Sequence, residues 1–218
     1  MNDTGRTSIE APSTRSWELT EDLVAPSEIL QRALDEAVLG GLTPISTGTA
    51  SLLTLLASTT RATNVVEVGT LMGGSALALM EGMDTTGVIT SIDSEAENQL
   101  PARSFLTEAG YPTSRFRLIA GSPLEVLPKL RDGAYDIVFI NGDKLEYVEY
   151  VANSLRLLRH GGLLVLNDVL WYNKVADEMD DSDEAIIMRE ALEAVTNSES
   201  YRQSLLPVGN GVLVASKH

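Results

Sequence analysis

Residues 64–75 read NVVEVGTLMGGS, a short β-branched run followed by a glycine-containing turn. Valine favours strands, whereas Gly69 and Gly73 let the backbone turn tightly and come close to a ligand. The helix expected after the glycines offers free NH groups in its first turn. The segment therefore predicts a strand, loop and helix that place a nucleotide-like cofactor at the end of the strand.

The alternation of strand and helix continues along the chain. Beyond residues 64–68 we expect strands at 88–93, 116–120, 135–140, 163–167, near Ser204 and at 212–215. Two capping boxes, SEAE at 94–97 and SPLE at 122–125, predict helix starts. This order predicts a doubly wound, mainly parallel α/β sheet, whose ligands bind at the carboxyl ends of the strands.

The residues before this repeat divide into a tail and two helices. Residues 1–15 are polar and predict a flexible N-terminal tail. Residues 27–39 carry apolar side chains at helical spacing and end at two glycines, and a second apolar helix is expected over about 47–58. We therefore expect a single domain over 16–218, with N-terminal helices in 16–60 and the strand and helix repeat in 61–218.

The amino-acid composition limits the kinds of partner that this protein is expected to bind. The 218 residues include 16 basic and 31 acidic side chains, and the net charge of −15 disfavours nucleic acid and anionic membranes. The chain has no cysteine, which excludes disulfides and thiolate chemistry and is typical of a cytoplasmic protein. Neither a membrane-spanning apolar stretch nor the order of a signal peptide is found. A small molecule is the expected partner.

Two features favour an adenosine cofactor without a diphosphate. A dinucleotide fingerprint would need a glycine two residues after Gly69, where the chain has Leu71. Asp93 ends the second predicted strand, where a carboxylate can accept both hydroxyls of a ribose. Taken alone, Gly69 is equally well explained as a turn glycine, and Asp93 as a helix-capping carboxylate.

The chain resembles the catechol and caffeoyl-CoA type O-methyltransferases from about residue 43 to its end, most specifically over 65–177. The segments that carry the resemblance are VVEVGTLMGGSALAL, ITSID, AGYPTSRFRLIAGSPLEVLPKL, YDIVFINGDKLEYVEY, LLRHGGLLVLNDVLWYNKVAD and LLPVGNGVLVASK. The resemblance implies a bacterial member with a Rossmann-like core in 61–218, in which helices cover both faces of a seven-stranded, mostly parallel sheet with one antiparallel strand near its edge. It also implies S-adenosylmethionine as cofactor and, through the apolar helix at 27–39, a homodimer.

The resemblance further implies which residues bind the cofactor. Glu67, Gly69, Gly73 and Ser75 would line its methionine end, and Asp93 its ribose. Gly121 and Ser122 would lie at the adenine, and the stretch around Thr43 and Thr47 would close over the methionine. The full expected set is Thr43, Glu67, Gly69, Thr70, Gly73, Ser75, Asp93, Gly121, Ser122 and Asn141.

The acceptor end departs from the family pattern. Family members commonly read D-x-D-K where this chain reads NGDK (141–144), and D-N where it reads Asn167 and Asp168. In the family these positions hold a divalent cation, usually magnesium or calcium. A hard cation prefers carboxylates, and this chain offers one carboxylate, Asp168, and two amides, Asn141 and Asn167. We therefore expect a weakened metal site, which Asp143 would help to complete.

By the same resemblance, Lys144 is the candidate catalytic residue, together with Asp143. Lys144 can act as general base if burial lowers its pKa, and its alternative role is that of a surface lysine that pairs with Asp143. Trp171 resembles the aromatic wall of the acceptor pocket, or else it only packs beside the sheet.

The leading hypothesis is an S-adenosylmethionine-dependent O-methyltransferase that acts on a small, hydroxylated, aromatic-type acceptor. The altered metal positions favour an alternative, a non-catalytic descendant that serves as a cofactor-binding or dimeric interaction module. A nicotinamide-dependent oxidoreductase is a third hypothesis, opposed by Leu71.

Overall fold

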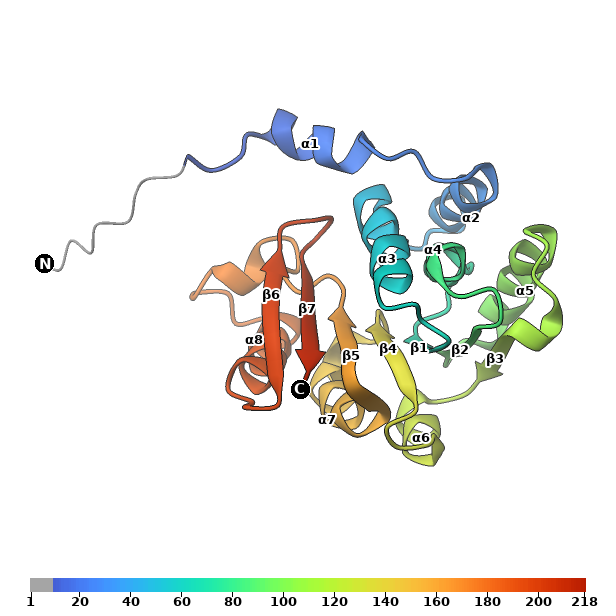
Figure 1. The fold of residues 1–218 in the computed structure, drawn as a ribbon. Coiled ribbons are helices and arrows are strands. Elements are labelled where there is room, and N and C mark those ends of the chain that lie inside the picture. The colour runs from blue at the N-terminus through green and yellow to red at the C-terminus, as the bar shows by residue number, and fades with distance from the viewer. Residues whose placement is uncertain (1–9) are drawn as a thin grey trace, which may run out of the picture.

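The computed structural model describes residues 10–218, which build a seven-stranded sheet with strand order β3-β2-β1-β4-β5-β7-β6 (Figure 1). The strands are β1 (Asn64–Val68), β2 (Val88–Asp93), β3 (Phe116–Ala120), β4 (Tyr135–Ile140), β5 (Leu158–Leu166), β6 (Tyr201–Leu206) and β7 (Val212–Lys217). Neighbouring strands from β3 to β5 pair in parallel, and β7 is antiparallel to both β5 and β6. The predicted fold, with one antiparallel strand near the edge, is confirmed.

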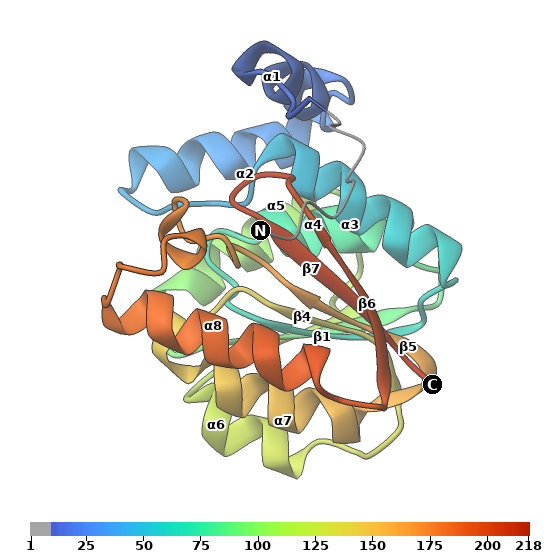
Figure 2. The same ribbon diagram turned by 90° about the vertical axis from the view of Figure 1, so that its left-hand side faces the viewer.

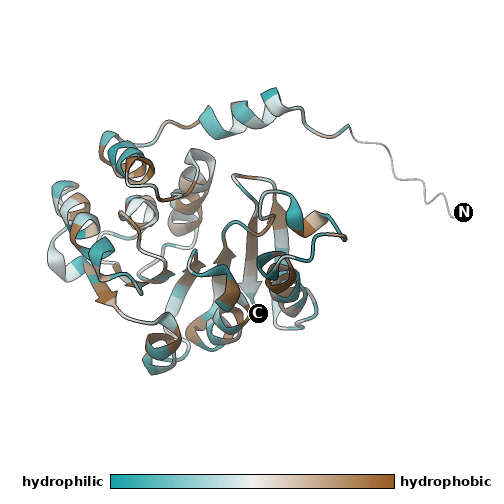
Figure 3. Ribbon diagram, turned by 180° about the vertical axis from the view of Figure 1, so that it is seen from behind, coloured by the Kyte–Doolittle hydropathy of each residue, from teal (hydrophilic) through white to brown (hydrophobic). Residues whose placement is uncertain are grey.

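Helices cover both faces of the sheet (Figures 1 and 2). On one face, a single apolar cluster joins the sheet to four helices: α2 (Glu28–Leu39), α3 (Thr47–Thr59), α4 (Gly74–Gly82) and α5 (Gln99–Glu108). The other face carries α6 (Pro123–Val126), α7 (Tyr147–Leu157) and α8 (Asp183–Thr196). Because β4 is buried on both sides, its residues 137–140 form a continuous apolar run, and this strand is among the brown segments of Figure 3.

Five short 3₁₀ turns connect these elements: η1 (Ala96–Asn98), η2 (Thr113–Arg115), η3 (Leu127–Lys129), η4 (Lys144–Glu146) and η5 (Lys174–Ala176). Within residues 10–218, no helix has the length and apolar character needed to cross a membrane.

The predicted N-terminal tail is too long. Helix α1 (Thr14–Asp22) begins inside it, whereas residues 1–9 lie outside the described part of the chain. The helix is held by one buried carboxylate, Glu21, which accepts hydrogen bonds from the backbone NH groups of Gly48 (2.9 Å) and Gly209 (2.6 Å). Since Glu21 is the only buried residue of α1, the helix has no apolar stripe that a sequence could reveal.

Two further local predictions are corrected. Neither Ser94 nor Ser122 makes a side-chain capping bond. The helix start predicted at Pro123 is confirmed, with Ser122 at the N-cap of α6, whereas α5 begins later than predicted, after η1. After β2, Asp93 instead accepts the NH of Glu95 at 2.8 Å. Strand β5 begins at Leu158, five residues before the predicted start at 163, and its register against β4 shifts between Tyr135 and Ile137.

The order of connections reverses between β1 and β4, so the space above their carboxyl ends is the switch point of the sheet. Gly69 and Asn141 are the first residues after these two strands. The NH of Asn141 donates to the carbonyl of Val68 at 2.8 Å, which holds the two loops together. The fold thus brings the residues singled out in two distant segments to one place.

Candidate active site

A cleft of about 460 Å³ opens at the carboxyl ends of β1, β2 and β4. Four predicted cofactor residues line it: Gly69, Asp93, Ser122 and Asn141. Asp143, predicted at the acceptor end, also lines it, whereas sequence reasoning missed Leu42, Leu71, Glu95, Asn98, Glu146 and Tyr150 as lining residues. Glu95 and Asn98 lie two and five positions beyond Asp93, so their closeness to a strand end was the available signal.

Gly69 makes the close approach of the two loops possible. Its backbone lies in the left-handed region, with φ of +94°, and a Cβ there would lie 2.3 Å from the carbonyl oxygen of Asn141. Gly73, with φ of +85°, is the N-cap of α4, and a Cβ there would come within 3.0 Å of Ala102 in α5. Both glycines are therefore required by the packing of the protein itself.

The Asp93 carboxylate organises the rim of the cleft. One of its oxygens accepts from the NH of Leu71 (2.9 Å) and from the Asn98 side chain (3.0 Å), and the other accepts from the NH of Glu95 (2.8 Å). The second oxygen therefore keeps a lone pair for a ligand hydroxyl. The carboxylate joins the loop after β1 to the loop after β2.

Glu67 lies behind the glycine loop and is fully buried. One of its oxygens accepts from the Ser91 hydroxyl at 2.5 Å, and the hydroxyls of Ser91 and Thr70 lie 2.6 Å apart. The other oxygen has no hydrogen-bond partner among the described residues. Burial raises the pKa of Glu67 to about 7, against the opposing influence of the Ser75 and Ser91 hydroxyls. An unsatisfied buried acceptor of this kind fits a cationic ligand group.

The remaining predicted cofactor residues lie around the cleft rather than on its wall. Ser75 lines a small cavity next to the cleft, and Asn141 borders both. Thr43 is exposed, and its neighbour Leu42 lines the cleft instead. Thr47 donates to the carbonyl of Glu21 at 2.9 Å and so serves the docking of α1. Gly121 precedes the lining residue Ser122.

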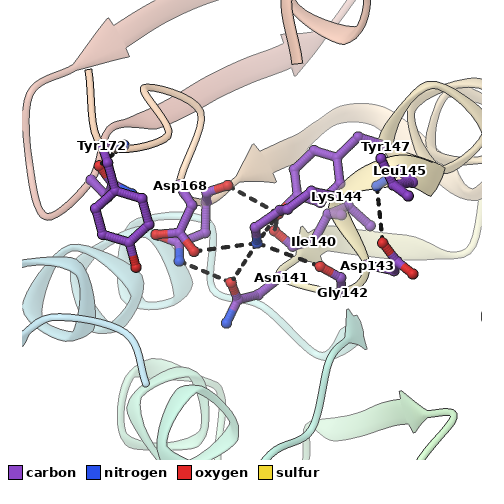
Figure 4. A network of polar contacts seen from close by, with 11 residues as sticks. Ile140, Asn141, Gly142, Asp143, Lys144, Leu145, Tyr147, Asp168 and Tyr172 are labelled. Atoms are coloured by element: carbon purple, nitrogen blue, oxygen red, sulfur yellow. Dashed lines mark hydrogen bonds and ion pairs between the residues drawn. The ribbon is translucent and has the colours of Figure 1, made fainter. Parts of the chain in front are cut away.

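Lys144 is surrounded by oxygen atoms (Figure 4). Its Nζ lies 3.2 Å from Asp168 Oδ2 and 2.9 Å from the Tyr147 hydroxyl, and it makes longer contacts of 3.4 Å with Asn141 Oδ1 and the Gly142 carbonyl. Burial lowers the pKa of Lys144 below its ordinary value of 10.5, while the Asp168 carboxylate opposes the decrease.

Asp143 does not pair with Lys144, so this alternative was wrong. The Asp143 side chain is exposed at the rim of the cleft and accepts the NH of Leu145 at 3.0 Å, where it caps η4 (Figure 4). The partner of Lys144 is Asp168, which follows a different strand.

The residues predicted to hold a metal do meet in space, but they do not fit a divalent ion. Asn167 Nδ2 donates to Asn141 Oδ1 at 3.0 Å, and that oxygen also faces Lys144. Residues 10–218 contain no group of three or more His, Asp or Glu side chains that could hold a metal. A hard dication prefers several anionic oxygens, and here the single carboxylate is paired with an ammonium.

Trp171 lies beside this network. Its ring centroid is 5.8 Å from Lys144 Nζ, and its loop is strained, with positive φ at Asp168 (58°), Trp171 (40°), Tyr172 (55°) and Asn173 (68°). Tyr172 and Asn173 also line a second hollow of about 510 Å³ between this loop and α1. Trp171 itself lines neither the cleft nor this hollow, and its role as a pocket wall stays a prediction.

The sheet and the cleft at its switch point define the class of protein: this is the Rossmann-like fold of the S-adenosylmethionine-dependent methyltransferases. The O-methyltransferase family model matches residues 27–218, and the chain belongs to this family. The predicted activity class, methyl transfer to oxygen, is confirmed at this level.

Similar proteins agree with this assignment. A Mycobacterium ulcerans protein named as an O-methyltransferase is 37% identical over 195 residues, which span 89% of this chain and 87% of the relative. A Corynebacterium glutamicum structure has a TM-score of 0.84 at 30% identity and covers 91% of this chain and 93% of its own. The O-methyltransferase TomG from Streptomyces achromogenes, solved with S-adenosylmethionine, shares the fold with a TM-score of 0.84 at 24% identity, over 95% of this chain and 99% of its own.

Proposed function

We propose that this protein binds S-adenosylmethionine in the cleft at the switch point and transfers its methyl group to a hydroxyl of a small, aromatic-type acceptor. The observation that carries the proposal is the presence of two carboxylates at the same strand ends. Asp93 lies at the cleft rim, and Glu67, behind Gly69, has a buried oxygen without a hydrogen-bond partner among the described residues. Asp93 would accept a ribose hydroxyl. Glu67 would attract the ammonium of the methionine moiety, and Ser122 would lie near the adenine.

When bound, S-adenosylmethionine would supply an electrophilic methyl carbon, whose bond to sulfur would break as its bond to the acceptor oxygen forms, while the proton of the acceptor hydroxyl would leave to solvent. The protein has to hold that oxygen in line and favour its anionic form. Lys144 is the candidate for this role, with Trp171 beside it as a pocket wall. The Lys144 Nζ contacts oxygens that can accept a hydrogen bond, which favours the ammonium form over a neutral amine. Lys144 would therefore stabilise the anionic acceptor oxygen and would not remove its proton.

A calorimetric titration with S-adenosylmethionine in the presence of a chelator tests this function. Saturable binding to one site is the expected result. A folded sample that does not bind the cofactor would refute the proposal, and tight binding of NADH would favour the oxidoreductase instead. Cofactor binding without turnover on any phenolic acceptor would favour the non-catalytic module.

Cofactor affinity should depend on pH through Glu67. Its pKa of about 7 in the free protein means that it is largely protonated at pH 5.5. The cofactor ammonium favours the carboxylate, so affinity should increase roughly tenfold from pH 5.5 to 7.5, with release of a proton. The stability of the free protein should fall over the same range, because a raised carboxyl pKa favours folding only at low pH.

Calorimetry in buffers of different ionisation enthalpy measures this proton release. The Glu67→Gln variant should lose both the release and the pH dependence, whereas Glu149→Gln, at an exposed position on α7, should keep both. An unchanged pH profile in Glu67→Gln would remove Glu67 from the site.

We also propose that the protein is a homodimer. The surface of α1, α2 and the loop between them exposes several large apolar side chains: Leu19, Leu23, Val24, Val38 and Leu39. Exposed apolar surface of this extent is typical of an interface. Light scattering should give a mass near twice 23.5 kDa, and a monomer at micromolar concentration would contradict the proposal. The cytoplasmic location stays a prediction.

A further inference from the structure

The Lys144 ammonium lies where the resemblance places a metal ion. Asn141 and Asp168, two of the three predicted ligands, direct oxygens at Nζ, and the third, Asn167, bonds to Asn141. The side chain of Lys144 leaves η4, at the end of β4, and reaches the loop after β5 (Figure 4). Its position is over-determined, because Tyr147 also contacts Nζ through both its hydroxyl and its ring, whose centroid is 4.9 Å away.

The hydrogen bonds around Nζ also fix the amides in an orientation unsuited to a metal. An ammonium only donates, so Asn141 must present Oδ1 to it, and Asn167 must then direct its NH₂ group at the same oxygen. An NH₂ group cannot coordinate a cation. The charges of Lys144 and Asp168 cancel, so the local charge does not attract a second cation.

We propose that Lys144 is a built-in cation that replaces the divalent ion at this site, so that the protein binds its acceptor without a metal. This inference rests on the proposed function and specifies how its acceptor oxygen is held. The two 3.4 Å contacts of Nζ are weak, and an acceptor oxygen can displace them while the bonds to Asp168 and Tyr147 persist. An ammonium does not chelate, so the site does not require two neighbouring oxygens on the acceptor.

Manganese binding, followed by the loss of the free Mn²⁺ signal in electron paramagnetic resonance, tests the proposal directly. In the wild type, titration up to about 1 mM Mn²⁺ should reveal no saturable binding site that depends on Asp168. The variant that combines Asn141→Asp, Asn167→Asp and Lys144→Met places three carboxylates there without the lysine and should bind Mn²⁺. Saturable binding in the wild type that Asp168→Ala abolishes would overturn the proposal. Mn²⁺ binding that survives Asp168→Ala would lie elsewhere on the acidic surface and would agree with the proposal.

Thermal unfolding gives a second readout that does not depend on activity. Lys144→Met should lower Tm by about 5 °C or more, because it leaves Asp168 without its partner, and Asp168→Asn should partly restore it in the double variant. Lys174→Met, at an exposed position in η5, should change Tm little. An increase of the wild-type Tm with 5 mM Mg²⁺ that is lost in Asp168→Asn would overturn the proposal.

The same samples separate this inference from the proposed function. Titration with S-adenosylmethionine in a chelator should give equal affinity in the wild type and in Lys144→Met. Loss of cofactor binding in the wild type would refute the function, whereas a metal at Asp168 together with intact cofactor binding would refute only the built-in cation.

Discussion

Replacing Gly69 with alanine is expected to destabilise the protein by at least about 3 kcal/mol and to abolish cofactor binding. The new Cβ would lie 2.3 Å from the carbonyl oxygen of Asn141, a backbone atom that cannot rotate away. The loops after β1 and β4 must therefore separate, which breaks the 2.8 Å bond between Asn141 NH and the Val68 carbonyl. Denaturant unfolding, together with calorimetric titration of S-adenosylmethionine, measures both effects.

Gly110→Ala is the matched control. Gly110 has nearly the same backbone conformation, with φ of +86°, but nothing lies within 4 Å of the position of its Cβ. Its substitution should destabilise the protein only through the strain of an alanine in the left-handed conformation, by about 1 kcal/mol, and should leave cofactor affinity unchanged. If both variants lost the same stability, the contact between the two loops would not be what requires Gly69.

Replacing Asp93 with alanine is expected to weaken S-adenosylmethionine binding at least 100-fold while the protein stays folded. The change removes the carboxylate that would accept a ribose hydroxyl, and hydrogen bonds to a charged group are worth about 1.5–3 kcal/mol each. It also frees the NH groups of Leu71 and Glu95, so the rim of the cleft loses its link between the loops after β1 and β2. Calorimetry gives the affinity, and circular dichroism verifies the fold.

The control for this change is Asp84→Ala. The Asp84 carboxylate accepts the NH of Thr86 at 2.8 Å, the same local bond that Asp93 makes with Glu95, but it lies on an exposed turn outside the cleft. Its loss should leave cofactor affinity within about twofold of the wild type. Equal losses in both variants would mean that turn geometry, and not contact with the ligand, governs affinity.

The bounds of β1 to β4 agree with those expected from the sequence. Their signals are local, since each strand is a short run rich in apolar and β-branched residues and is bounded by a glycine or a polar residue. For the same reason Gly69 and Asp93 could be assigned to one cleft: each directly follows or ends a strand of a parallel sheet. The Ser94 cap failed because the chain first forms the 3₁₀ turn η1 at Ala96–Asn98, so that α5 begins only at Gln99.

Other residues could not be assigned from local patterns. Glu21 binds Gly209, which is 188 positions away, so nothing near it in the sequence announces the docking of α1. Lys144 is a candidate from the sequence, but the only partner that the sequence suggested for it, as one of two alternatives, was the adjacent Asp143. The adjacent carboxylate instead caps η4, and the ammonium crosses to the next strand end.

The sequence by itself determined the fold class, the order of strands and helices, and the edge of the sheet that carries the site, because hydrophobic periodicity and turn residues act over a few positions. Only the tertiary structure decided what the site contains. Whether Asn141, Lys144 and Asp168 form a metal site or an ion pair depends on which loops meet above the β4 and β5 ends and on how each side chain satisfies its hydrogen bonds. Those are contacts between separate segments of the chain, which no local pattern specifies.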